Sequence, residues 1–73
     1  MAQNINVLYQ SYEEELREVL LDNFEGRPGS RRNLSQQLKQ LKRHPNFDPK
    51  KLEQVVLNAH RDVIQRLEVQ GKL

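Results

Sequence analysis

Apolar residues in the first third of the chain recur every three or four positions, as they do on one face of a helix. They are Ile5, Leu8, Tyr9, Tyr12, Leu16, Val19 and Leu20. This spacing predicts an amphipathic helix over residues 5–25. Gly26 and Pro28 then interrupt the pattern, so the segment from Arg27 to Ser30 is expected to form a turn.

A second, shorter helix is predicted over residues 31–44. Its apolar face consists of Leu34, Leu38 and Leu41, at spacings of four and three. Either Ser30 or Asn33 can cap its N-terminus, because both side chains accept hydrogen bonds from the free amides of a first turn. Pro45 ends it, since the residue before a proline avoids helical geometry.

The third predicted helix, over residues 49–70, has the strongest start signal and is expected to be the longest. Asp48 is a favoured N-cap, Pro49 suits the first helical position, and Phe47 can staple onto Leu52. Gly71 is a natural stop. The predicted buried face consists of Leu52, Val55, Val56, Ala59, Val63 and Leu67.

Leu57 and Ile64 fall outside that face and broaden the apolar surface of the third helix. Two interpretations are open. The third helix can be the central one, in contact with both others, or these two residues can form the seam of a homodimer. In either case the fold class is all-α, a small three-helix bundle that occupies residues 1–73 as one domain.

Composition limits what else the chain can be. With 73 residues, 36% of them hydrophobic, the core is expected to be thin. The absence of cysteine excludes disulfides and, with only two histidines, a sulfur-rich zinc site, so no metal or other cofactor is expected. No apolar run approaches the roughly 20 residues of a membrane span, and no signal peptide is visible. A cytoplasmic protein without a membrane partner is the expectation.

Charge is strongly segregated along the chain. Residues 1–26 carry one cation and six acidic groups, a net charge of −5, whereas residues 27–51 carry eight cations and one acidic group, a net charge of +7. The eight predicted nucleic-acid-binding residues are Arg27, Arg31, Arg32, Lys39, Lys42, Arg43, Lys50 and Lys51. On a helical wheel the cations of residues 31–44 lie opposite the leucines, beside a strip of glutamines, an arrangement that suits phosphates and base edges.

These cations also have ordinary structural explanations. Lys42 and Arg43 complement the dipole at a helix C-terminus, whereas Lys50 and Lys51, like Arg31 and Arg32, oppose it in a first turn. The arginines could instead pair with Asp22 and Glu25 across the turn. Only cations that stay unpaired can serve a partner.

An acidic face is the basis of the alternative hypothesis. Glu14, Glu18 and Asp22 stand at successive i, i+4 positions without an interleaved lysine, which is mildly self-repelling. Together with Leu57 and Ile64, these residues predict a docking surface for a protein partner, with charge steering the approach.

Catalysis is not expected. His44 lies at a helix end and His60 at the border of an apolar face, and neither is near a candidate nucleophile. Paired carboxylates such as Glu14 and Glu18 act as acid and base only when burial separates their pKa values, and nothing apolar surrounds these two.

The C-terminal segment VIQRLEVQGKL, residues 63–73, resembles the end of the recognition helix in winged-helix DNA-binding proteins. The resemblance covers about eleven residues and implies a DNA-binding helix followed by a wing. The chain departs from that family because no strand is predicted in residues 1–33 and no wing hairpin follows Leu73. Ordinary C-capping by Gly71 accounts for the same pattern.

The sequence therefore favours two alternative functions. The first is a small regulatory protein that binds duplex DNA or structured RNA through its basic residues, because Tyr9 and Tyr12 lie on the core face and leave no platform for stacking single-stranded bases. The second is a protein-interaction module, either an adaptor or an inhibitor.

Overall fold

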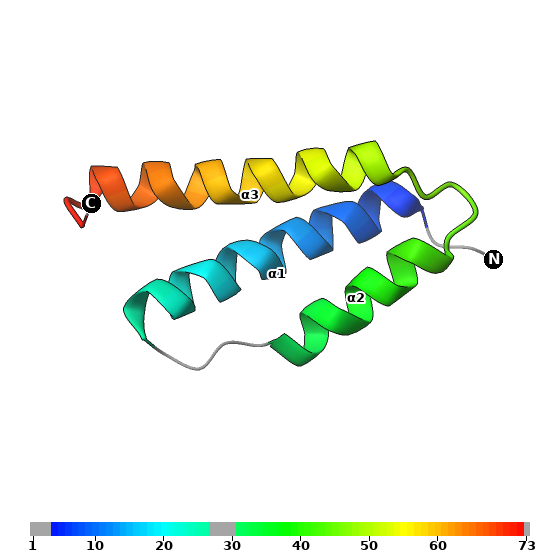
Figure 1. Cartoon of the computed structure of the whole chain (residues 1–73), viewed down its shortest axis with the longest axis horizontal. Coiled ribbons are helices and arrows are strands. Elements are labelled where there is room, and N and C mark those ends of the chain that lie inside the picture. The colour runs from blue at the N-terminus through cyan, green and yellow to red at the C-terminus, as the bar shows by residue number, and fades with distance from the viewer. Residues whose placement is uncertain (1–3, 27–30, 73) are drawn as a thin grey trace.

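The structure, a computed structural model, describes residues 4–26 and 31–72, apart from the side chains of residues 31–33. The described residues form three helices: α1 (Ile5–Glu25), α2 (Arg31–Arg43) and α3 (Pro49–Val69) (Figure 1). The predicted all-α, three-helix bundle is confirmed, with helix bounds within one residue of those expected. α3 is not the longest helix, since α1 and α3 both have 21 residues.

The helix ends follow local capping chemistry. Asn4 caps α1, accepting a hydrogen bond of 2.9 Å from the amide of Asn6. Asp48 caps α3 as predicted, accepting at 3.0 Å from the amide of Lys50, with Pro49 in the first turn. α2 begins at Arg31, which places Asn33 inside the helix rather than at its cap, because a cap residue precedes the first helical one. Ser30 and the expected turn at 27–30 lie outside the described residues.

The C-terminus of α3 ends in a Schellman motif. Gly71 has a φ of 72°, the left-handed conformation that glycine adopts without strain. Its amide donates to the carbonyl of Glu68 at 3.0 Å, and the amide of Lys72 donates to the carbonyl of Leu67 at 2.8 Å. The predicted stop at Gly71 is confirmed. This cap also accounts for the segment that resembles a winged-helix recognition helix, and the described residues contain no strand.

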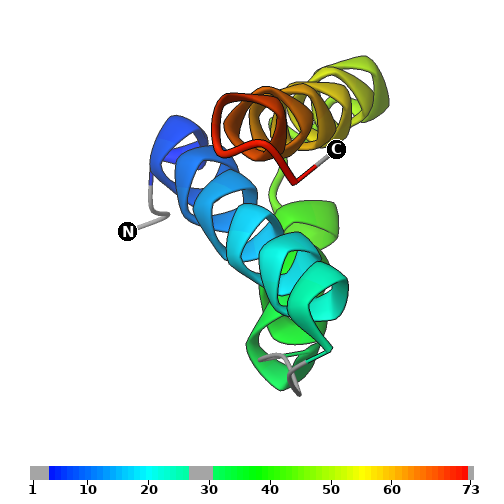
Figure 2. The ribbon, with the colours of Figure 1, turned by 90° about the vertical axis from the view of Figure 1, so that its left-hand side faces the viewer.

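α1 is the central helix. It packs against both α2 and α3, whereas the backbones of α2 and α3 make no close approach within the described residues. α1 runs antiparallel to α2 and parallel to α3 (Figure 1), and the view along the bundle shows α2 and α3 diverging on either side of it (Figure 2). The expectation that α3 is central is therefore wrong. The reason lies in α1, whose buried Tyr9, Tyr12 and Val19 are flanked by Leu8 and Leu20 and so face two neighbours.

Most of the buried core forms one cluster along the three predicted apolar faces. Its buried members are Tyr9, Tyr12, Leu16, Leu41, Val55 and Ala59, and the partly buried hydrophobic residues packed against it are Ile5, Leu8, Leu20, Leu34, Leu38, Phe47, Leu52 and Val56. Val19, Val63 and Leu67 are also buried, outside this cluster. Leu41 and Ala59 are completely inaccessible. Phe47 and Leu52 pack against the same cluster, as expected of a staple. None of the three described helices has the length and hydrophobicity that crossing a membrane requires.

Candidate functional site

The end of α2 and the start of α3 lie at the same end of the molecule, joined by residues 44–48 (Figure 1). This connection is tied to α1 by Tyr9. The Tyr9 hydroxyl donates to the carbonyl of Asp48 at 3.1 Å and accepts from its amide at 3.0 Å. Within the connection, the amide of Asn46 donates to Nδ1 of His44 at 3.1 Å. The ends of α2 and α3 are thus held in place by hydrogen bonds as well as by the core.

Five cations surround this connection, and we call them the basic end. They are Lys39, Lys42, Arg43, Lys50 and Lys51. All five are exposed, and none makes a hydrogen bond or an ion pair through its side chain within residues 4–26 and 31–72. Their charges are therefore not used by the fold, and they remain available to an external anion.

The five cations do not all share one face. On α2, Lys39 and Arg43 are one turn apart, on the side away from Leu38 and Leu41. Lys50 is exposed in the first turn of α3, whereas Lys51 borders a shallow groove between α1 and α3. That groove is lined by Asn6, Tyr9, Gln10, Glu13, Lys51, Gln54, Val55 and Asn58. The cations therefore cover one end of the bundle rather than a single stripe.

The remaining predicted nucleic-acid-binding residues are Arg27, Arg31 and Arg32. Arg27 is outside the described residues, and so are the side chains of Arg31 and Arg32. Both arginines belong to the start of α2, about 17 Å along the helix axis from Arg43 at a rise of 1.5 Å per residue. The structure thus places part of the predicted set at one end of α2 and part at the other.

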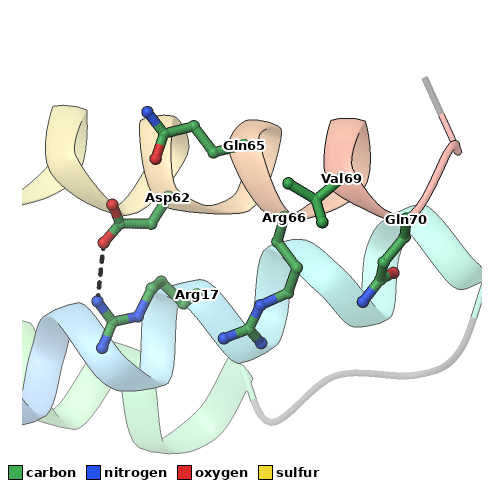
Figure 3. A pocket seen from close by; sticks show the side chains of 6 residues that line it. All are labelled: Arg17, Asp62, Gln65, Arg66, Val69 and Gln70. Carbon is green, nitrogen blue, oxygen red and sulfur yellow. Dashed lines mark hydrogen bonds and ion pairs between the residues drawn. The ribbon is translucent and has the colours of Figure 1, made fainter.

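Other cations are bound by carboxylates at the α1–α3 seam, which we define as Glu13, Arg17, Glu25, Asp62 and Lys72. Nη1 of Arg17 lies 2.9 Å from Oδ2 of Asp62 and 3.2 Å from Oε1 of Glu13 (Figure 3). Nζ of Lys72 lies 3.4 Å from Oε1 of Glu25. Arg17–Glu13 lies within α1, whereas the pairs Arg17–Asp62 and Lys72–Glu25 join residues 45 and 47 positions apart in the chain. They connect α3 to α1 along the length of the bundle.

The predicted acidic face is only partly free. Glu14 and Glu18 are exposed and make no ion pair among the described residues, but Asp22 is engaged. The predicted pairing of Asp22 and Glu25 with arginines across the turn stays a prediction, because those arginine side chains lie outside the described residues. Glu25 also forms an ion pair with Lys72. Asp22 and Glu25 therefore contribute to the fold, whereas Glu14 and Glu18 form no ion pair with another described residue.

A shallow, open groove of about 530 Å³ lies beside the seam, between α1 and the C-terminal half of α3 (Figure 3). It is lined by Arg17, Asp62, Gln65, Arg66, Val69 and Gln70. Sequence analysis missed this groove, because nothing local to α3 indicates which of its polar residues face α1. Arg17 is already held by two carboxylates, so the guanidinium of Arg66 is the cation that the groove leaves without an ion pair in the described part of the chain.

The two extra apolar residues of α3 are open to solvent. Leu57 is 53% exposed and Ile64 is 47% exposed, and we call this pair the α3 strip. Helix geometry places both more than about 100° around the axis from the middle of the buried face, on a side that neither α1 nor α2 covers. A central position of α3 therefore does not explain them.

The histidines make local contacts. Nδ1 of His60 lies 2.8 Å from the carbonyl of Val56 one turn earlier, and His44 is held within the α2–α3 connection. Among the described residues no group of three or more potential metal-ligating side chains occurs. The expectation that the protein is not an enzyme stays a prediction.

Comparison of the chain with protein-family models, with curated proteins and with solved structures finds no match.

Proposed function

We propose that this chain is a small non-catalytic regulatory protein that binds nucleic acid through its basic end. The observation that carries the proposal is the state of the five cations there, which are exposed and unpaired among the described residues while Arg17 and Lys72 are bound by carboxylates. Binding to nucleic acid requires cations of this kind, because each phosphate that they neutralise releases counterions.

Local electrostatics add support, since some contacts of the basic end oppose folding, although Lys42 and Arg43 complement the dipole at the end of α2. Lys39 and Arg43 are like charges at i, i+4, which repel by about 0.2–0.5 kcal/mol. Lys50 and Lys51 stand in the first turn of α3, where the helix dipole disfavours cations. Phosphates placed over this end would relieve both effects. Phosphate groups are therefore the ligands that best match the charge of the basic end.

The aromatic residues favour a duplex or a folded RNA over a single strand. Tyr9 and Tyr12 are 4% and 7% exposed, and Phe47 packs against the core. Phe24 is exposed, but it lies at the end of α1 remote from the basic end. Single-strand binders stack bases on exposed aromatic rings, and the basic end lacks a freely exposed one in the described part of the chain. Contact with the phosphates of a double helix needs no such ring.

The test is a fluorescence-anisotropy titration with a mixed-sequence duplex DNA and a structured RNA at roughly 50 and 200 mM salt, the range over which phosphate contacts show. The Lys39→Glu/Arg43→Glu variant should bind at least about tenfold more weakly than the unmodified chain. Arg61→Glu/Arg66→Glu is the matched control, because it makes the same change of net charge at two exposed cations on α3 outside the basic end. Absence of binding at the lower salt, or equal losses in both variants, would refute the proposal.

One observation favours a second function, a protein-interaction module such as an adaptor or an inhibitor. The acidic residues Glu14 and Glu18 and the α3 strip are all exposed. Capture of a defined partner protein in this case would survive Lys39→Glu/Arg43→Glu and fail with Glu14→Lys/Glu18→Lys. A cytoplasmic location belongs to both proposals.

A further inference from the structure

α2 and α3 are attached to α1 in different ways. Hydrogen bonds between Tyr9 and Asp48 bind the start of α3 to α1, and the two interhelical ion pairs of the seam bind the rest of it. No described side chain of α2, over residues 34–43, forms a hydrogen bond or an ion pair with α1. These residues of α2 are therefore held by apolar contacts.

The apolar contacts of α2 are few. Leu41 is the one buried side chain among its described residues, and Leu34 and Leu38 are partly buried. α3 buries four side chains. α2 has 13 residues, a length at which an isolated helix is marginal in water. Because it packs against α1 alone in the described part of the chain, α2 depends on this one contact to remain helical.

A polar side chain of α2 points into that contact. Gln37 follows Leu34 by three residues and precedes Leu41 by four, so all three lie on the same face of the helix. Oε1 of Gln37 is buried and has no hydrogen-bond partner within residues 4–26 and 31–72. Since α1 is the helix that covers this face, the oxygen is buried against α1.

Glu15 brings a second polar group to the same contact. It is two residues from both Glu13 and Arg17, and therefore about 160° around α1 from these two residues of the α1–α3 seam. That side of α1 faces α2, because α2 and α3 lie on either side of α1 (Figure 2). Oε1 of Glu15 is also buried without a partner among the described residues. We call Glu15 and Gln37 the polar pair.

The polar pair opposes the docking of α2. A buried oxygen that gains no partner has lost its hydrogen bonds to water without replacement, and for a carboxylate the loss is larger than for an amide. Separation of α2 from α1 returns both oxygens to water. It leaves the hydrogen bonds and ion pairs between α1 and α3 intact, since none of them includes a residue of α2.

We infer that α2 opens from α1 as a unit while α1 and α3 stay packed, and that the polar pair keeps the closed state weak. Lys39, Lys42 and Arg43 move with α2, whereas Lys50 and Lys51 remain on α3. The basic end is therefore complete only in the closed state. That the closed state is the one that binds nucleic acid rests on the proposed function, whereas the opening of α2 does not.

Native-state hydrogen exchange without nucleic acid tests the opening. The amides of residues 38–41 should exchange at least about tenfold faster, relative to their intrinsic rates, than those of residues 16–19 and 59–63, because local opening exposes them without global unfolding. Equal opening equilibria in the three helices would overturn the inference. Because no nucleic acid is present, such a failure is separate from a failure to bind DNA or RNA.

A variant that weakens only the packing of α3 on α1 distinguishes local from global opening. Val63 is buried on α3, whose backbone does not approach that of α2 within the described residues. Val63→Ala should speed exchange in α1 and α3 by about tenfold or more, through lost packing, and leave exchange in α2 unchanged. An equal acceleration in α2 would show that α2 opens only with the whole protein, which contradicts the inference.

Two variants that should strengthen the closed state test the polar pair. Gln37→Leu removes an unpaired buried acceptor, and Glu15→Gln replaces a carboxylate with an amide of the same shape that costs less to bury. Each should slow exchange in α2 by about fivefold or more. Gln36→Leu and Glu14→Gln are the matched controls, because they make the same changes at exposed neighbours. Slowing no greater than that in the controls would overturn the role of the polar pair.

Discussion

The α1–α3 seam and the basic end use the same kinds of side chain in opposite ways. At the seam, Arg17 lies within 3.2 Å of two carboxylates, with a side-chain exposure of 32%. At the basic end, Lys39 and Arg43 are exposed and reach no carboxylate in the described part of the chain. The seam joins two helices, whereas the cations of the basic end form no ion pair with any other described residue.

This difference separates charges that serve the fold from charges that are free to serve a partner. Partly buried ion pairs contribute modestly to stability but fix the register between helices. Exposed, unpaired cations contribute almost nothing to stability, and their removal should therefore change binding alone. Folding and binding should therefore divide between these two regions.

The largest expected effect compares two adjacent residues of α2. Leu41 is completely buried, so Leu41→Ala should lower the free energy of unfolding by about 2–5 kcal/mol through lost packing and a residual cavity. Lys42 next to it is exposed, and Lys42→Gln should change stability by less than about 0.5 kcal/mol. Urea denaturation followed by circular dichroism measures both. A comparable loss of unfolding free energy in Lys42→Gln would show that the basic end contributes to the stability of the fold and would contradict the division.

The next effect concerns the bond that holds the basic end to α1. Tyr9→Phe removes a hydroxyl that both donates to and accepts from the backbone of Asp48, and should destabilise the protein by about 1 kcal/mol while leaving the aromatic packing intact. Thermal unfolding measures the change. Hydrogen exchange at the amide of Asp48 should rise more than at the amides of α1, and unchanged exchange there would contradict the assigned role.

Most of the fold was predictable because its signals are local. The apolar periodicity of each helix and the caps at Asp48 and Gly71 depend on residues within one or two turns of each other. The central position of α1 was not predictable in this way. It depends on how wide an arc of each helix is buried, and the broad apolar face of α3 suggested the wrong helix.

The candidate site was predictable only in its composition. Sequence analysis found the cations of residues 39–51, but not which of them the fold would leave unpaired. The contacts Arg17–Asp62 and Tyr9–Asp48 span 45 and 39 residues, so they depend on the register of helices distant in sequence. Arg66 and its groove were missed for the same reason.

A smaller effect is expected at the seam itself. A double-mutant cycle with Arg17→Met and Asp62→Asn should give a coupling of about 0.5 kcal/mol at low salt, because both side chains are partly exposed, at 32% and 45%. The coupling should decrease as salt rises. Denaturant titrations at two salt concentrations measure the coupling. A coupling of zero at low salt would show that the Arg17–Asp62 pair does not help to hold α3 against α1.

The smallest effect appears only at alkaline pH. Burial raises the pKa of the Tyr12 hydroxyl above its ordinary value of 10.0, since ionisation would place a charge in a poorly solvated position. Above the unfolded pKa, the folded state holds this proton more tightly than the unfolded state does, so stability should fall as pH rises through 10 and beyond. Thermal unfolding from pH 9 to 11 should show this loss, with a smaller loss in Tyr12→Phe. Equal losses would contradict it.

The separation of folding charges from binding charges is tested most directly by the salt dependence of duplex DNA binding in Lys39→Gln/Arg43→Gln. For the unmodified chain the logarithm of the binding constant should fall linearly with the logarithm of salt concentration, and the variant should reduce that slope by about 1.8, or 0.9 per lost phosphate contact. Its free energy of unfolding should stay within about 0.5 kcal/mol of the original. An unchanged slope, or a large loss of stability, would contradict the account.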